Sequence, residues 1–309
     1  PFVLKSVTPK SSIEMAKNDA YWDKENVKIE NVKFTFWDGK DQDVIAKGFA
    51  DGQYSKARIF PTSSTYEKYA ADFKDNIYFN EPGAGVATVS LNYGRTTYNH
   101  TAKTSDAQKT STQKALLNKE FRQALNFAVD RNSYSAQTNG TDGAAVAIRN
   151  TFAPYNLQVG KKTFGELVQD SLAKTNSSTW SNVSLADSQN GLYNEEKAKE
   201  IFAKAKSSLQ AEGVEFPIHL DALVIQESTA VVNRVQSLKQ SLEATLGTDN
   251  VVVDIQQLQK DEVLNVTYFA ETAAGQDWDV SDNVGWGPDY IDPSTYLDIL
   301  KPSVGESTK

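Results

Sequence analysis

Residues 216–258 read FPIHLDALVIQESTAVVNRVQSLKQSLEATLGTDNVVVDIQQL, and this stretch predicts the fold. Its two ends, FPIHLDALV and NVVVDIQQL, are short, largely apolar segments bounded by turn residues, as expected for strands. The apolar residues between them recur at helical spacing: Val231, Val235, Leu238 and Leu242. We therefore expect a helix from Thr229 to Leu246 that ends at Gly247.

The chain continues with a segment that favours a short helix, Asp261 to Phe269, and with a strand-like segment, WDVSDNV, at residues 278–284. Strand–helix–strand–helix–strand order is typical of a parallel or mixed α/β sheet. Ligands of such sheets gather at the carboxyl ends of the strands. The loop GWGPDYIDP, residues 285–293, follows the last predicted strand and is therefore the candidate binding loop.

Further elements are expected upstream of this unit. Strand patterns occur at residues 2–7, 11–18, 31–37 and 86–94, the last of them predicted to be buried. In NVKFTFW, the third of these, Val32, Phe34 and Phe36 share one face. Helices are expected after the capping residues Asn118 and Asn194. Residues 96–112, TTYNHTAKTSDAQKTST, are polar and rich in Thr and Ser, which predicts a long surface loop.

Composition narrows the possible classes of protein. A chain of 309 residues exceeds what one compact core usually serves, so two structural units are expected. The formal net charge of -8 argues against nucleic acid as a partner, because phosphate binding needs a basic face. The absence of cysteine excludes disulfides, thiolate nucleophiles and zinc–cysteine sites. No apolar run approaches the roughly 18 residues of a membrane span.

Candidate catalytic residues are few. His100 and His219 are the only histidines, and neither has a second ligand or an orienting group in sequence, so we expect structural roles and no metal site. No G-x-S-x-G turn supports a Ser–His–Asp triad. Two acid pairs, Asp279 with Asp282 and Asp289 with Asp292, would suit a glycoside hydrolase if their environments differed. Because such acids are more often turn and cap residues, no catalytic residue and no cofactor is predicted.

Three segments carry a resemblance to a known family: PFVLKSVTPKSSIEMAKNDAYWD (1–23), FRQALNFAVDR (121–131) and WDVSDNVGWGPDYIDP (278–293). Together, and in this order, they resemble the extracellular solute-binding proteins of family 5, and among these the streptococcal oligopeptide-binding lipoproteins of the Ami/Ali type. The resemblance implies an α/β fold of the periplasmic-binding-protein-like class II, with two lobes and mixed sheets. Residues 1–88 would form the C-terminal part of lobe one and residues 89–309 an incomplete lobe two, as in an internal fragment.

The resemblance also implies roles for the loop. In this family the ligand lies extended between the lobes and hydrogen-bonds like an added strand. Gly285 and Gly287 would offer backbone groups to that ladder, and Asp289 would pair with the peptide's α-ammonium. Trp286, flanked by glycines and free to stand in a cleft, would form the wall of a side-chain pocket, with Tyr290 beside it.

Two further positions of this segment refine the expectation. Asn283 occupies the place where receptors that clamp short peptides carry an arginine, which favours longer peptides with a loosely held C-terminus. Asp292, which precedes Pro293, is expected to be a turn or cap residue rather than a ligand contact.

The function implied is capture of oligopeptides outside the cell and delivery to the membrane subunits of an ABC permease. A monomer is expected, placed as a cell-surface lipoprotein of a Gram-positive bacterium or otherwise in a periplasm. Three alternatives remain open at this point: the same fold with another cargo (a sugar, a metal chelate or haem), a peptide-sensing surface protein, and a carboxylate-dependent hydrolase.

Overall fold

The computed structural model describes residues 1–78, 83–302 and 305, except for the side chains of residues 273, 283 and 284. In this part the chain is a mixed α/β structure with three sheets. The largest sheet has four strands in the order β4-β9-β7-β8. The second sheet has three strands in the order β1-β2-β3, and the third consists of β5 and β6. No helix in the described ranges is both long and apolar enough to cross a bilayer.

The four-stranded sheet combines parallel and antiparallel pairs. Strands β7 (Ile218–Ile225) and β8 (Val251–Leu258) are parallel over their full length, and α9 (Thr229–Leu246) connects them. Strand β9 (Val280–Trp286) is parallel to β7 at Ala222↔Val280 and antiparallel to β4 (Val86–Leu91). The mixed α/β sheet predicted from the strand–helix order is therefore confirmed, and the helix expected at 229–246 has the predicted bounds.

The two faces of β7 differ in chemistry. Ile218, Leu220, Ala222 and Val224 alternate along the strand and belong to the hydrophobic core, where helix α9 also packs. Alternation places His219 and Asp221 on the opposite face. On that face the Nδ1 of His219 lies 2.8 Å from Oδ2 of Asp254 on β8.

Helices cover this core as a second layer. Helices α4 (Lys119–Ala128) and α8 (Glu195–Ala211) pack against each other, with the rings of Phe121 and Phe202 6.1 Å apart. Both begin at the predicted asparagine caps: Asn118 accepts from the Phe121 amide and Asn194 from the Lys197 amide. The remaining elements of this body are α3 (Asp106–Leu117), α5 (Arg131–Ala144), β5 (Gln158–Val159), β6 (Lys162–Thr163), α6 (Phe164–Thr175), α7 (Ser177–Trp180), α10 (Lys260–Val266), η3 (Ala273–Gly275), α11 (Pro293–Leu297) and η4 (Asp298–Leu300).

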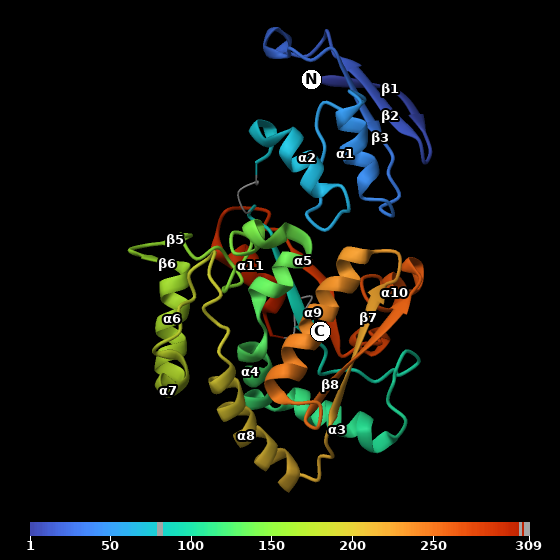
Figure 1. Cartoon of the computed structure of the whole chain (residues 1–309). Helices are drawn as coiled ribbons and strands as arrows, with labels where there is room; N and C mark the ends of the chain where they lie inside the picture. The colour runs from blue at the N-terminus through green and yellow to red at the C-terminus, as the bar shows by residue number, and fades with distance from the viewer. Residues whose placement is uncertain (79–82, 303–304, 306–309) are drawn as a thin grey trace.

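The N-terminal elements lie at the top of Figure 1. They are β1 (Phe2–Thr8), β2 (Ser12–Lys17), η1 (Lys24–Asn26), β3 (Asn31–Thr35), α1 (Asp43–Ala50), α2 (Tyr66–Asp72) and η2 (Lys74–Asn76). The three predicted strands are confirmed, but the shared apolar face is not buried: Phe34 is 57% and Phe36 54% exposed. A sheet buries a face only against another layer, and the described residues supply little cover there.

The polar stretch at residues 96–112 departs from its prediction. Helix α3 begins at Asp106, where the Ser105 side chain accepts from the Gln108 amide. Ser111 and Thr112 are buried, and the Thr112 hydroxyl donates to the carbonyl oxygen of His219 at 2.9 Å. Residues 96–105 are irregular, as predicted, but the surface-loop prediction was wrong for residues 106–112, where Ser and Thr side chains are buried through hydrogen bonds. Strand β4, predicted to be buried, is an edge strand and only partly buried.

Helix α5 is broken at Gly140, which has φ +69° and ψ 172°. A Cβ at this position would lie 2.7 Å from Cβ of Pro61, in the segment between α1 and α2. Glycine therefore permits both the left-handed backbone and the close approach of the N-terminal elements to α5.

We expect Gly140→Ala to lower the free energy of unfolding by about 2–5 kcal/mol, from backbone strain and from the contact with Pro61. Gly160→Ala is the matched control: Gly160 also has a positive φ, but nothing lies within 4 Å of an added Cβ. That variant should lose only about 1–2 kcal/mol. Urea denaturation of both variants measures the difference, and equal losses would mean that the approach of Pro61 carries no energy.

Candidate functional site

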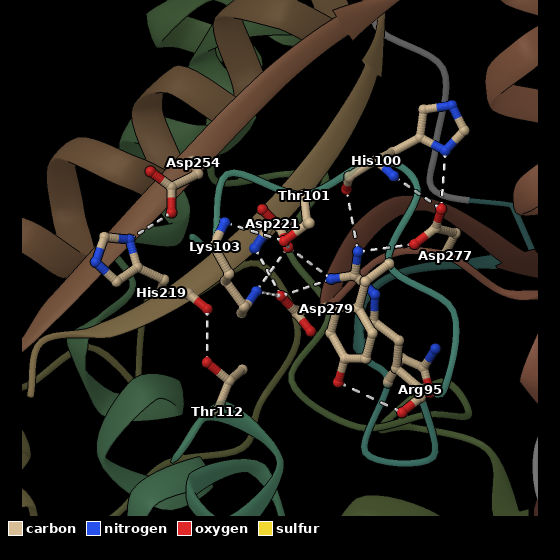
Figure 2. Close-up of polar contacts among 12 residues, drawn as sticks. Arg95, His100, Thr101, Lys103, Thr112, His219, Asp221, Asp254, Asp277 and Asp279 are labelled. Atoms are coloured by element: carbon tan, nitrogen blue, oxygen red, sulfur yellow. Dashed lines mark hydrogen bonds and ion pairs between the residues drawn. The ribbon is translucent and has the colours of Figure 1, made fainter. Parts of the chain in front are cut away.

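A buried cluster of charged residues joins the segment Arg95–Lys103 to Asp221 of strand β7 and to Asp277 and Asp279, which lie just before β9, as Figure 2 shows. The Arg95 guanidinium lies 2.7 Å from Asp221, 2.8 Å from Asp277 and 2.9 Å from Asp279. Lys103 Nζ lies 2.6 Å from Asp221 and is also paired with Asp279. Both cationic side chains are fully buried. The sequence identified neither cation as buried, because their partners are more than 100 positions away.

The buried carboxylates are also well supplied with hydrogen bonds. Asp221 accepts from the Thr101 hydroxyl at 2.7 Å and from the Ala102 amide at 2.8 Å. Burial alone would raise the pKa of Asp221, but Lys103 and these hydrogen bonds outweigh it and lower that pKa to about 2. The charged groups of the cluster are therefore paired with one another inside the protein, which fits a structural role better than a ligand site.

His100 belongs to the edge of this cluster. Its Nδ1 lies 2.9 Å from Asp277, and its Nε2 lies 3.0 Å from Glu262 on α10. Burial disfavours the charged imidazolium, but the hydrogen bonds and charges of Glu262 and Asp277 outweigh burial and raise the pKa of His100. The sequence showed no partner for His100, since both acids lie more than 160 positions downstream. Among the described residues no group of three or more His, Cys, Asp or Glu could hold a metal ion.

Strand β9 leads from this cluster to the candidate binding loop. Its register with β4 shifts between Thr88 and Ser90, so Asp282 and Asn283 together face the single residue Val89. Such a bulge bends a strand and redirects its side chains. The described pairs with β7 end at Val280. Beyond Val280, the described strand pairs of β9 are with β4 alone.

The glycines and Trp286 lie at the end of this strand. Gly285 faces Ala87 of β4, and a Cβ there would lie 3.4 Å from the carbonyl oxygen of Val86. Around Gly287 there is open space. The Trp286 indole does not stand free: its Nε1 donates to the carbonyl oxygen of Thr295 at 2.9 Å, and its ring packs beside Tyr296. The glycines on either side of Trp286 suggested that the indole lies in open space, but residues of α11 occupy that space.

The acids of the loop have different environments. Asp292 caps α11 by accepting from the Ser294 amide at 2.8 Å, which confirms the cap interpretation. Asp289 is exposed, and Tyr290 beside it is 75% exposed. The side chain of Asn283 lies outside the described part of the chain.

The other acid pair is divided between two environments. Asp279 belongs to the charge cluster, whereas Asp282 lies 3.0 Å from Arg234 and accepts from the Tyr134 hydroxyl at 3.3 Å. Burial raises the pKa of Asp282 although Arg234 opposes the shift. The two carboxylates thus have different cationic partners, and they do not form the facing pair that a glycoside hydrolase needs.

Two cavities adjoin helix α5, and the second also borders the four-stranded sheet. The first, of about 750 Å³, is lined by α1 and α2, with Phe49 and Tyr69, and by α5, with Gly143. The second, of about 850 Å³, is lined by β4, α4, α5, α9 and β9. Both include Thr138 and Asn139, so they adjoin at α5. Asp282 lines the second cavity, and residues 285–290 line neither of the two.

The segment that leads into β4 is held by a clamp that the sequence did not reveal. The Arg149 guanidinium donates to the carbonyl oxygens of Gly83, Ala84 and Gly85 at 3.0–3.3 Å. The Tyr296 hydroxyl donates to Ala84 as well, at 2.6 Å. The end of β4 that faces Trp286 is thereby fixed from two sides.

Ligands of α/β sheets commonly bind at the carboxyl ends of the strands, and the loop that follows β9 lies at such an end. The family of bacterial extracellular solute-binding proteins, family 5 Middle, matches residues 1–307. The chain belongs to this family.

Several relatives match along the whole chain. It is 58% identical over 310 residues to the oligopeptide-binding protein AliA of Streptococcus pneumoniae, which covers 100% of this chain and 47% of AliA. It is also 58% identical to the oligopeptide-binding protein SarA of Streptococcus gordonii, covering 100% of this chain and 46% of SarA. The chain therefore spans about half the length of the curated relatives it matches.

Solved structures share the fold. Listeria monocytogenes OppA bound to peptide superposes with a TM-score of 0.61 at 20% identity, covering 98% of this chain and 49% of that one. The pheromone receptor PrgZ gives a TM-score of 0.60 at 20% identity, with the same coverage. This likeness confirms the predicted α/β fold of the periplasmic-binding class.

The raised pKa of His100 predicts a pH dependence of stability. Stabilisation from the protonated imidazole should be fully present below the unfolded-state pKa of about 6.5 and lost as pH rises through the higher folded-state pKa. His100→Gln should abolish this loss, whereas His219→Gln, which removes the other imidazole, should keep it. The measurement is urea denaturation from pH 5.5 to 8.5. An unchanged pH profile in His100→Gln would contradict the assignment.

Proposed function

We propose that this chain is part of an extracellular receptor that binds extended oligopeptides and delivers them to an ABC permease. The observation that carries the proposal is the strand pairing of β9. Its described pairs with β7 end at Val280. From there to Trp286 the described pairs are with β4, on the other edge of the strand. A strand end of this kind can accept a peptide as an added strand through main-chain hydrogen bonds. The oligopeptide-binding relatives support the same cargo.

The ligand would lie between two lobes. We assign residues 1–88 to the end of lobe one and residues 89–309 to lobe two. The cavity between α1, α2 and α5 supports this division, because its wall includes residues of both parts, such as Phe49 and Gly143. Closure of the lobes around a peptide would be the signal that the permease recognises.

Within the loop we assign a role to each candidate residue. Gly285 and Gly287 offer backbone groups to the peptide, and Asp289 pairs with its α-ammonium. An ion pair that is exposed to water contributes little binding free energy. The contact between Asp289 and the α-ammonium therefore becomes strong only when the ligand and the facing lobe exclude water. Trp286, fixed by Thr295, gives the peptide a rigid wall.

Two neighbouring residues complete this assignment. Tyr290, with its exposed ring, packs on a ligand side chain. Asn283, in place of an arginine, leaves the strand open to peptides of variable length.

Partners and location follow from the same proposal. The receptor would act outside the cell, as a monomer held at the surface by a lipid anchor, with the membrane subunits of a permease as its protein partner. It would perform no chemistry, and the separation of Asp279 from Asp282 supports this over the hydrolase alternative.

Asp289→Asn should weaken binding of a peptide with a free N-terminus about tenfold, through loss of one charge-assisted bond. Affinity for the N-acetylated form of the same peptide should not change, because it carries no α-ammonium. Isothermal titration calorimetry measures both, and Asp261→Asn, at an exposed position on α10, controls for the loss of one negative charge. Equal weakening of both peptides would refute the role of Asp289.

A further inference from the structure

Three consecutive carbonyl oxygens in the segment before β4 accept hydrogen bonds from one side chain. Nη1 of Arg149 donates to the carbonyl oxygens of Ala84 and Gly85, at 3.3 and 3.0 Å. Its Nη2 donates to the carbonyl oxygen of Gly83 at 3.1 Å. A guanidinium presents its donors in a rigid planar fork, so these bonds restrain the backbone over three successive residues. No acid in the described part of the chain forms an ion pair with Arg149, so what it supplies here is hydrogen-bond donors.

Helix α11 supplies a second donor to the same segment. The Tyr296 hydroxyl donates to the carbonyl oxygen of Ala84 at 2.6 Å. That oxygen can accept both bonds because a carbonyl oxygen has two lone pairs. Tyr296 is only 1% exposed, so the surrounding core holds its ring in this position. The carbonyl group of Ala84 therefore joins the segment before β4 to two donors that lie 65 and 212 positions further along the chain.

The segment held in this way lies against the strand end that we assign to the peptide. Val86 pairs with Trp286, and Ala87 pairs with Gly285. An added Cβ on Gly85 would lie 3.4 Å from the carbonyl oxygen of Trp286, so the two backbones are in close contact. Packed protein interiors transmit displacements because they have little compressibility. A shift of the segment would therefore move the main chain at Trp286 and Gly285.

Trp286 connects the strand end to α11. Its Nε1 donates to the carbonyl oxygen of Thr295, and its ring packs beside Tyr296. The contacts form a closed ring, which runs from α11 to the segment before β4, across the strand pair to Trp286, and from Trp286 to α11 again. The main chain at Trp286 is thus restrained both by β4 and by α11.

We propose that Arg149 and Tyr296 are positioning residues of the peptide site. They act through the main chain, because by holding residues 83–85 they fix Trp286 and Gly285 in the geometry that accepts an added strand. A site that is ordered before binding loses less conformational entropy when the ligand binds, so its affinity is higher. The inference rests on the proposed peptide-binding function and adds to that site two residues from outside the loop at 285–293.

The first test measures the affinity of penta-alanine, whose small side chains leave the main chain as the principal source of binding. Tyr296→Phe removes one hydroxyl and keeps the ring, and it should weaken binding about two- to tenfold. Arg149→Gln should weaken binding about tenfold, because an amide replaces only part of the fork. Arg149→Lys keeps the charge without the fork and should resemble Arg149→Gln. Isothermal titration calorimetry measures all three affinities.

Two controls match these changes. Tyr193→Phe also removes a hydroxyl that donates a hydrogen bond, here to Glu195 at 2.7 Å, and Lys204→Gln removes an exposed positive charge on α8. Both variants should bind penta-alanine as the wild type does. Wild-type affinity in Arg149→Lys would mean that the charge acts and the fork does not, which would refute the positioning role.

The second test separates positioning from general stabilisation and needs no ligand. In a chain labelled with 5-fluorotryptophan, the Trp286→Phe variant identifies the fluorine NMR signal of Trp286 among those of the five tryptophans. Arg149→Gln and Arg149→Lys should shift or broaden this signal and leave that of Trp22, which is 86% exposed, unchanged. A residue with a merely structural role would lower the free energy of unfolding without changing the native signal of Trp286.

The outcomes distinguish this inference from the function on which it rests. A wild-type chain that does not bind penta-alanine would overturn both. Wild-type binding that is unchanged in Tyr296→Phe and in the Arg149 variants would overturn the inference alone, as would an unchanged Trp286 signal in the folded Arg149 variants. If circular dichroism shows that the Arg149 variants do not fold, the affinity of Tyr296→Phe decides the question.

Discussion

The rest of the structure depends on the buried charges that Arg95 and Lys103 share with Asp221 and Asp279. A buried charge is tolerated only when it is paired and hydrogen-bonded, and removal of one partner costs several kcal/mol, about 3–5. Because Asp221 and Asp279 each pair with both cations, loss of Arg95 or of Lys103 would leave both buried carboxylates with one cation fewer. The ion pairs bind a polar segment before α3 to strand β7 and to the residue before β9, both more than 100 residues further along the chain.

This constraint determines where β9 begins and how it is used. Asp279, the residue before β9, is held by the cluster, and Asp282 within the strand is held by Arg234 and Tyr134. The bulge at Asp282 and Asn283 lies between the fixed start and the loop that follows Trp286. Strand β9 thus connects a rigid interior to an open end, the arrangement expected where a ligand adds to a sheet.

The sequence by itself determined the elements whose signals are local. Periodicity placed α9 at Thr229–Leu246, asparagine caps placed α4 and α8, and the resemblance of three segments to a known family identified the fold. Only the tertiary structure decided the burial of Arg95 and Lys103, the contact of Trp286 with α11 and the clamp on residues 83–85. The physical reason is that periodicity and caps depend on neighbours within a few residues, whereas burial of a charge or a ring depends on partners from distant segments.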